Sequence, residues 1–227
     1  MWIDSVTLEP SVVIEVAVHP SPDAQAIIIN YPGYLGSIDG YNKKYATIAD
    51  HLSQKKVGAV VRMANTLWPH INYRQSVLDD LRAVIRYTLG HAAEMCATAT
   101  PDIYLMGFSA GAGAVAAVAA EYPAVKKILL MAPSEDAGKT ATKDGLAAFS
   151  GEVYIVVGSD DEVVGFEAGR RFLQMGILSP SRHLVVLPNC DHQFRGRVNG
   201  QIMSKAPLWA FAGDETFPSP EGGIELY

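Results

Sequence analysis

One serine lies between two glycines in the stretch GFSAG, where an apolar run meets a run of small residues. Gly107, Ser109 and Gly111 fit the pattern G-x-S-x-G, in which a sharp strand-to-helix turn presents a serine hydroxyl. The apolar run at 103–108 is predicted to be a buried strand, and the small residues after Ser109 are predicted to form a helix. A Gly-Ser-Gly turn without chemistry fits the same letters, so a nucleophilic serine also requires a base and an acid elsewhere in the chain.

Candidates for the acid and the base follow two later apolar runs. Asp160 and Asp161 come directly after the run that ends at Gly158, and His192 lies in the loop after the last apolar run. Catalytic groups of α/β proteins lie at the carboxyl ends of parallel strands, which is where these residues fall. We expect Asp161 to orient His192, with Asp160 as the alternative, because either acid could instead cap the helix expected to begin near Val163.

Together these residues resemble the α/β-hydrolase superfamily, over essentially the whole chain. The motifs that carry the resemblance are GFSAG at 107–111, GSDDEVV at 158–164 and CDHQF at 190–194. The resemblance implies Ser109 as nucleophile, His192 as base and Asp161 as the acid of a catalytic triad. It also implies that no cofactor takes part in the reaction.

The resemblance further implies an oxyanion hole, a pair of backbone N–H groups that stabilise negative charge on the substrate oxygen. In YPGYLGS, Gly33 and Tyr34 match the superfamily's oxyanion loop, whereas Pro32 stands where a histidine is common. The expected donors are the N–H groups of Ala110 and Tyr34, and an ordinary Pro-Gly turn is the alternative. The side chains expected around a substrate pocket are Leu35, Leu67, Trp68, Phe108 and Phe194.

No metal or nucleotide site is predicted. Cys96 and Cys190 lie far apart without the spacing of a metal site, so we expect two free thiols in a reducing compartment. The glycine-rich stretch GYLGSIDG lacks both the G-K-[ST] ending of a phosphate loop and the G-x-G-x-x-G pattern. Arg195 and Arg197, beside the histidine loop, are expected to be solvated, with a substrate carboxylate as the alternative partner.

The composition excludes several classes of partner. The 227 residues carry a net charge of −6, and the basic residues are scattered rather than clustered. This balance argues against binding nucleic acid or anionic lipid. The first ten residues, MWIDSVTLEP, do not have the pattern of a signal peptide, so a cytoplasmic location is expected.

The elements that must position these residues can be read from the hydrophobic pattern. Two alternating runs in the first twenty residues predict antiparallel strands. Six continuous apolar runs follow and alternate with helical patterns, which is typical of parallel strands buried on both faces. They are AIIIN, VGAVVRM, DIYLMGF, KKILLMA, VYIVVG and HLVVLP. The predicted fold is a single doubly wound α/β domain over 1–227, with antiparallel N-terminal strands and a short polar insertion near 133–149.

The predicted activity is hydrolysis of a small carboxylic ester or thioester through an acyl-serine intermediate. A peptidase, an amidase or an acyltransferase would use the same three residues, and the fold could also serve as a non-catalytic binding module. The insertion is too short for a large lid, which favours a small-molecule acyl substrate. The aromatic residues in 208–227 are expected to be exposed, packing on the domain or on a partner, and no oligomeric state is predicted.

Overall fold

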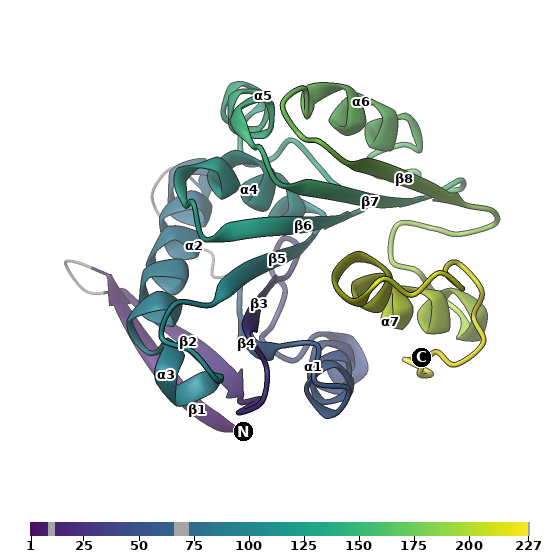
Figure 1. The fold of residues 1–227 in the computed structure, drawn as a ribbon. Coiled ribbons are helices and arrows are strands. Elements are labelled where there is room, and N and C mark those ends of the chain that lie inside the picture. The colour runs from purple at the N-terminus through teal and green to yellow at the C-terminus, as the bar shows by residue number, and fades with distance from the viewer. Residues whose placement is uncertain (9–11, 66–72, 227) are drawn as a thin grey trace.

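A computed structural model of the chain describes residues 1–8, 12–65 and 73–226 (Figure 1). Its strands form one eight-stranded sheet in the order β1-β2-β4-β3-β5-β6-β7-β8. The strands are β1 (Trp2–Leu8), β2 (Val12–His19), β3 (Ala26–Tyr31), β4 (Ala59–Met63), β5 (Asp102–Phe108), β6 (Val125–Met131), β7 (Glu152–Gly158) and β8 (Arg182–Leu187). β2 pairs antiparallel with both β1 and β4, and all other pairs are parallel. The predicted fold class, a mostly parallel sheet with antiparallel N-terminal strands, is confirmed.

The helices cover both faces of the sheet. They are α1 (Lys44–Gln54), α2 (Tyr73–Gly90), α3 (Ala92–Met95), α4 (Ala110–Val118), α5 (Lys139–Ala148), α6 (Glu167–Met175) and α7 (Arg197–Ala212), with short 3-10 turns η1 (Tyr41–Lys43) and η2 (Ala119–Glu121). α2, α4, α5 and α6 lie on one face, and α1 and α7 lie on the other (Figure 1). Each layer encloses its own apolar core against the sheet, as a doubly wound fold requires.

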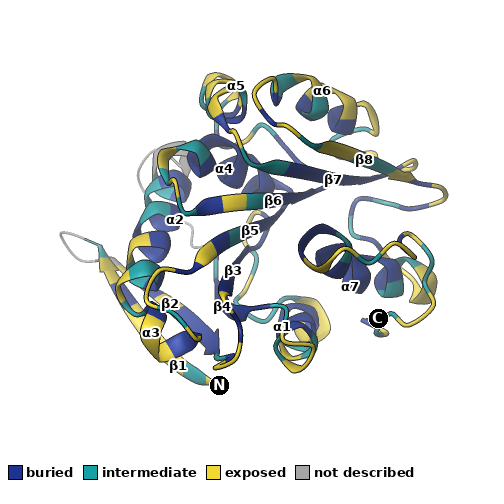
Figure 2. Ribbon diagram, in the orientation of Figure 1, coloured by how far each residue is buried: buried dark blue, intermediate teal, exposed yellow. Residues whose placement is uncertain are grey.

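The central strands are buried and the outer ones are not (Figure 2). Every residue of β3 and β4 is buried, which explains why these runs do not alternate and are apolar except at Asn30 and Arg62. β8 lies at the edge of the sheet, and of its six residues only Leu187 is buried. The expectation that its run is covered on both faces is therefore wrong, because the flanking helices cover the edge of the sheet incompletely.

The segment expected to be an insertion at 133–149 is the crossover that joins β6 to β7. Its second part is α5, which buries Thr142 and Leu146 and exposes a polar face to solvent. The polar composition therefore reflects an amphipathic helix rather than an added element. The helix expected near Val163 also differs, because turns occupy 162–164 and α6 begins at Glu167.

The C-terminal aromatics expected to be exposed are packed on the domain. The Phe211 ring stacks on Tyr104 of β5, with ring centroids 5.2 Å apart. The centroid of the Trp209 ring lies 4.9 Å from that of Tyr154 of β7 and 4.7 Å from that of Phe217. α7 carries Trp209 and Phe211 although it contains Pro207, a residue that normally breaks a helix, and no helix was predicted there.

Candidate active site

Ser109 occupies a strained turn between β5 and α4. Its backbone angles are φ 53° and ψ −117°, a conformation that a residue with a side chain rarely adopts. The strand ends one residue before it, at Phe108, and the helix begins one residue after it, at Ala110. The turn thus has the geometry that the G-x-S-x-G pattern predicted.

The two glycines of the motif are required by close backbone contacts. A Cβ atom at Gly107 would lie 2.6 Å from the backbone of Ala112, in the first turn of α4. A Cβ atom at Gly111 would lie 2.4 Å from the carbonyl oxygens of both Tyr31 and Pro32, at the end of β3. Any side chain at either position would force the helix away from the sheet and move Ser109 with it.

Ser109, His192 and Asp161 form a continuous chain of hydrogen bonds. The distance from Ser109 Oγ to His192 Nε2 is 3.1 Å, and the distance from His192 Nδ1 to Asp161 Oδ2 is 2.8 Å. All three residues are buried, with exposed fractions of 8%, 6% and 5% for Ser109, His192 and Asp161. His192 lies 83 residues after Ser109 and 31 residues after Asp161 in the sequence. The loops that follow β5, β7 and β8 bring the three side chains together.

Asp161, not Asp160, is the carboxylate that contacts His192. Its second oxygen, Oδ1, accepts hydrogen bonds from the N–H groups of Val163 and Val164 at 2.9 and 3.0 Å. The same side chain therefore holds the turn after β7 and the imidazole, so the two roles weighed for these acids are combined in one residue. Asp160 instead accepts a hydrogen bond from the Ser159 hydroxyl.

The acid loop and the histidine loop are joined by backbone hydrogen bonds. The N–H of Ser159 donates to the carbonyl of Leu187 at 2.8 Å, and the N–H of Asp160 donates to the carbonyl of Cys190 at 3.0 Å. In return, the N–H of Asn189 donates to the Ser159 hydroxyl oxygen at 2.9 Å. These contacts extend the β7–β8 pairing beyond the strands and set the distance between Asp161 and His192.

The loop that follows β3 lies directly against Ser109. A Cβ atom at Gly33 would be 3.1 Å from the Ser109 Cβ, so the backbone next to Tyr34 reaches the serine. On the other side, Ala110 is the first residue of α4, and the first N–H groups of a helix have no partner inside it. The two N–H groups expected as oxyanion donors therefore belong to two segments that both adjoin Ser109.

A cavity of about 580 Å³ opens over Ser109 and His192, and Leu35 and Phe108 are among its lining residues, as expected. A larger cavity of about 1020 Å³ adjoins it and shares Tyr34, Asp136 and Val163 as lining residues. Leu67 and Trp68, also expected at the pocket, lie outside the described residues.

Phe194 does not line the pocket, contrary to expectation. Its side chain is fully buried, and its ring meets the ring of Phe108 edge-on, with centroids 6.3 Å apart. The Phe108 ring in turn lies 5.2 Å from the ring of His192. Phe194 therefore supports the pocket from behind, because the tight turn that carries His192 points the next aromatic residue into the core.

The arginines beside the histidine loop contact acids of this chain. Arg195 lies 3.5 Å from Asp191, and Arg197 lies 3.7 Å from Glu225. Both arginine side chains are more than 70% exposed, at 73% and 72%, so these ion pairs contribute little to stability. The solvated arrangement expected for Arg195 and Arg197 is the one observed.

Sequence analysis missed several residues that line the cavity, of which the most unusual is Lys44. This lysine is only 4% exposed although it lies at the start of α1. Four positions separate it from Ile48, which places both on the buried face of the helix. That spacing was the available signal, whereas nothing in the sequence pattern indicated Tyr41, Asp136, Val163 or Gln193.

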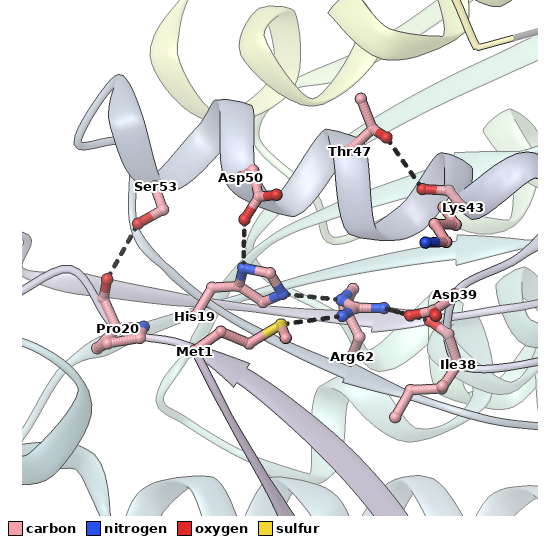
Figure 3. A network of polar contacts seen from close by, with 10 residues as sticks. All are labelled: Met1, His19, Pro20, Ile38, Asp39, Lys43, Thr47, Asp50, Ser53 and Arg62. Carbon is pink, nitrogen blue, oxygen red and sulfur yellow. Dashed lines mark hydrogen bonds and ion pairs between the residues drawn. The ribbon is translucent and has the colours of Figure 1, made fainter.

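One wall of the cavity is held by a buried arginine, Arg62 of β4 (Figure 3). Its Nη1 donates to the carbonyl of Ile38 at 2.8 Å and to the carboxylate of Asp39, both in the loop between β3 and α1. The same loop contributes Ser37 and Tyr41 to the cavity lining. Arg62 is 1% exposed, and its charge within an apolar strand was a signal that the sequence analysis did not use.

His19, at the end of β2, is a third hydrogen-bond partner of Arg62. Arg62 Nε can only donate, so His19 Nε2, at 3.1 Å, must accept and Nδ1 must carry the ring proton. That proton is donated to Asp50 of α1 at 2.8 Å (Figure 3). Burial and the nearby Arg62 charge lower the pKa of His19, and Asp50 opposes them only in part.

The two thiols, the grouping of metal-ligand side chains and the apolarity of the helices also bear on function. Cys96 and Cys190 are buried free thiols, as predicted. Burial raises the pKa of the Cys190 thiol to about 12, and the neighbouring carboxylates add to the effect, so it is protonated at neutral pH. Within residues 1–8, 12–65 and 73–226, no three His, Cys, Asp or Glu side chains are grouped as a metal site would need. None of the helices described in those ranges is both long and apolar enough to cross a membrane.

No protein-family model matches this sequence, and no curated protein matches it by sequence comparison. Solved structures do match its fold. An esterase domain from Rhodothermus marinus aligns with a TM-score of 0.70 at 18% identity, over 90% of this chain and 95% of the other. A dienelactone hydrolase from Anabaena variabilis gives 0.71 at 18%, over 92% and 97%. An esterase from Pyrococcus furiosus gives 0.72 at 13%, over 92% of each chain. The chain has the α/β-hydrolase fold.

Proposed function

We propose that this protein is a serine hydrolase that cleaves a small carboxylic ester or thioester through an acyl-serine intermediate. The observation that carries the proposal is the hydrogen-bonded chain from Ser109 through His192 to Asp161. The strained turn at Ser109 and the cavity above it support the same conclusion. The esterases and the dienelactone hydrolase that share the fold favour an ester over other acyl compounds.

In this mechanism, His192 acts first as a base and then as an acid. Its Nε2 takes the proton of Ser109 as Oγ attacks the carbonyl carbon of the substrate. The Asp161 carboxylate accepts a hydrogen bond from Nδ1, which fixes the required tautomer and stabilises the imidazolium. The imidazolium then protonates the departing oxygen or sulfur, leaving the acyl group on Ser109. A water molecule, deprotonated by His192, releases the acid and restores the serine.

The negative charge on the carbonyl oxygen needs donors beside Ser109. We assign this role to the backbone N–H groups of Ala110 and Tyr34. A donor of this kind typically lowers the barrier by about 3 kcal/mol. The N-terminal end of α4 adds a favourable dipole at the same place.

Kinetics with para-nitrophenyl esters test the proposal. Mixing enzyme with excess para-nitrophenyl acetate or butyrate should give a burst of nitrophenol matching the enzyme concentration, followed by a slower steady rate. Intact mass should then increase by one acyl group, mapped by peptide analysis to Ser109. Ser109→Ala should show neither burst nor adduct while keeping the wild-type circular dichroism. Hydrolysis that persists in Ser109→Ala would contradict the proposal.

A substrate panel separates the alternatives that use the same residues. Aryl esters, acyl thioesters and aminoacyl anilides are compared by kcat/KM, with a primary alcohol added to detect acyl transfer. We expect esters or thioesters to exceed anilides. Faster cleavage of anilides would indicate an amidase or peptidase, and a folded protein inactive on every substrate would indicate a binding module.

A further inference from the structure

A buried lysine, Lys44, lines the cavity that contains Ser109 and His192. Other lining residues are exposed, among them Tyr34, Leu35 and Tyr41, and they form the apolar rim of the cavity. The cavity around Ser109 therefore combines exposed aromatic and aliphatic groups with a buried cationic group.

The ammonium group of Lys44 contacts two aromatic rings. Lys44 Nζ lies 4.8 Å from the centroid of Phe108 and 5.1 Å from the centroid of Tyr45, distances typical of cation–π contacts. The same Phe108 ring also contacts the ring of His192 and belongs to the residue that precedes Ser109. The Phe108 ring thus contacts both the lysine ammonium and the imidazole of His192.

The electrostatic state of Lys44 favours an anion in the cavity. Removal from water disfavours a charged amine, and burial lowers the pKa of Lys44 to about 8. The amine is still mostly protonated at neutral pH, and its attraction for an anion is greater here than at the surface because less water screens it. Asp136 also lines this cavity, but its side chain is exposed, so water screens its negative charge more than it screens the buried ammonium of Lys44.

We propose that Lys44 determines specificity by binding a carboxylate, or another singly charged anionic group, that the substrate carries near its ester carbonyl. The inference rests on the proposed function, since it concerns the substrate of the same site. Lys44 takes no part in the covalent steps. It selects acidic acyl compounds over neutral ones of the same length, and the exposed aromatic and aliphatic rim accommodates the chain between the two polar ends.

Matched pairs of substrates test this inference. The acyl-side pairs are para-nitrophenyl monoesters of succinic, glutaric and adipic acid and their methyl-capped neutral forms. A leaving-group pair is the butyrate of para-hydroxybenzoic acid and that of its methyl ester. Uncatalysed hydrolysis is subtracted, and the readout is the ratio of kcat/KM for the charged over the neutral member. General losses of activity or of folded protein cancel in this ratio.

The wild type is expected to prefer the charged member of at least one pair by about tenfold or more, as a hydrogen bond to a charged group would give. Lys44→Met should abolish this preference, and Lys44→Arg should retain part of it. Lys43→Met is the matched control, because it removes the same charge from the neighbouring residue, whose side chain is exposed and does not line the cavity. It should leave the ratio unchanged.

Two results would overturn the inference without affecting the proposed function. One is hydrolysis of neutral esters with no preference for the charged member of any pair. The other is a preference that survives in Lys44→Met, or that Lys43→Met removes equally. If no ester of either charge is cleaved by the folded wild type, the proposed function fails, and the inference fails with it.

Discussion

The two walls of the cavity over Ser109 are built in different ways. On one side, the turn between β5 and α4 is shaped by backbone contacts that leave no room for side chains at Gly107 and Gly111. On the other side, the loop between β3 and α1 is held by side chains, because the buried Arg62 bonds to Ile38 and Asp39. The first wall carries the nucleophile, and the second borders the space for the substrate.

Because the two walls are built differently, we expect one to control the reactivity of Ser109 and the other to control substrate binding. The stretch GFSAG at 107–111, which forms the backbone wall, contains no charged residue or histidine, so its geometry should be insensitive to pH. The side-chain wall depends on Arg62 and on a neutral His19, and it leads directly into α1, where Lys44 begins the helix. Substitutions on the first wall should therefore reduce kcat or folding, whereas substitutions on the second should act mainly on KM and selectivity.

The largest effect is expected at the acid. Asp161→Asn should lower kcat for aryl esters by about 10⁴-fold, because the amide no longer fixes the imidazole tautomer. Asp160→Asn is the matched control one residue away, since its exposed side chain accepts a hydrogen bond from the Ser159 hydroxyl. It should change kcat less than about threefold, as surface substitutions generally do. Equal losses in the two variants would contradict the assignment of Asp161.

The backbone wall is tested by adding one methyl group. Gly111→Ala should lower the free energy of unfolding by about 3 kcal/mol, since the Cβ would lie against two carbonyl oxygens. Gly90→Ala, at the end of α2, meets no atom within 4 Å and should raise stability by up to about 1 kcal/mol. Urea unfolding compares the two. A Gly111→Ala variant as stable as wild type would show that α4 can move away from the sheet freely.

The side-chain wall is tested by removing its buried charge. Arg62→Met should lower the free energy of unfolding by about 2 kcal/mol, because the Ile38 carbonyl and His19 lose their donor. Its kcat/KM should fall mainly through a higher KM. Arg86→Met, which removes an exposed arginine from α2, should change neither quantity. If both variants behave alike, Arg62 does not support the cavity wall.

The smallest effect is expected from the pH dependence of His19. The pKa of His19 is lowered in the folded protein, so the neutral form favours folding at pH values above the ordinary histidine pKa. That contribution is lost as the pH falls through the lowered pKa, because His19 must then be protonated and can no longer accept from Arg62. His19→Gln should flatten this acid-side loss of stability. A wild-type protein whose urea midpoint does not change between neutral and mildly acidic pH would contradict the role of His19.

The sequence predicted the backbone wall well because local patterns encode it. GFSAG specifies its own turn, and the loops that carry Asp161 and His192 each follow a recognisable apolar strand. Their meeting is a consequence of strand order, since the carboxyl ends of parallel strands share one edge. The edge strand β8 was misjudged because an apolar run does not indicate whether helices cover both faces.

The side-chain wall could not be predicted in the same way. Arg62 contacts residues 24 and 43 positions away, and no local motif links them. Phe194 is an aromatic residue two positions after His192, which made it a candidate for the pocket, but the turn after His192 directs its side chain into the core. α7 was missed because Pro207 masks a helix that packing against β6 and β7 stabilises. In each case a contact between distant segments decides the outcome.

The most direct test of the account is covalent labelling with a fluorophosphonate probe, because it requires a base-activated serine and no knowledge of the substrate. Wild type, Ser109→Ala and His192→Ala are compared after circular dichroism has shown that each is folded. The account predicts one adduct in the wild type, mapped to Ser109, and none in either variant. A folded wild type that remains unlabelled, or an adduct that persists in Ser109→Ala, would contradict it.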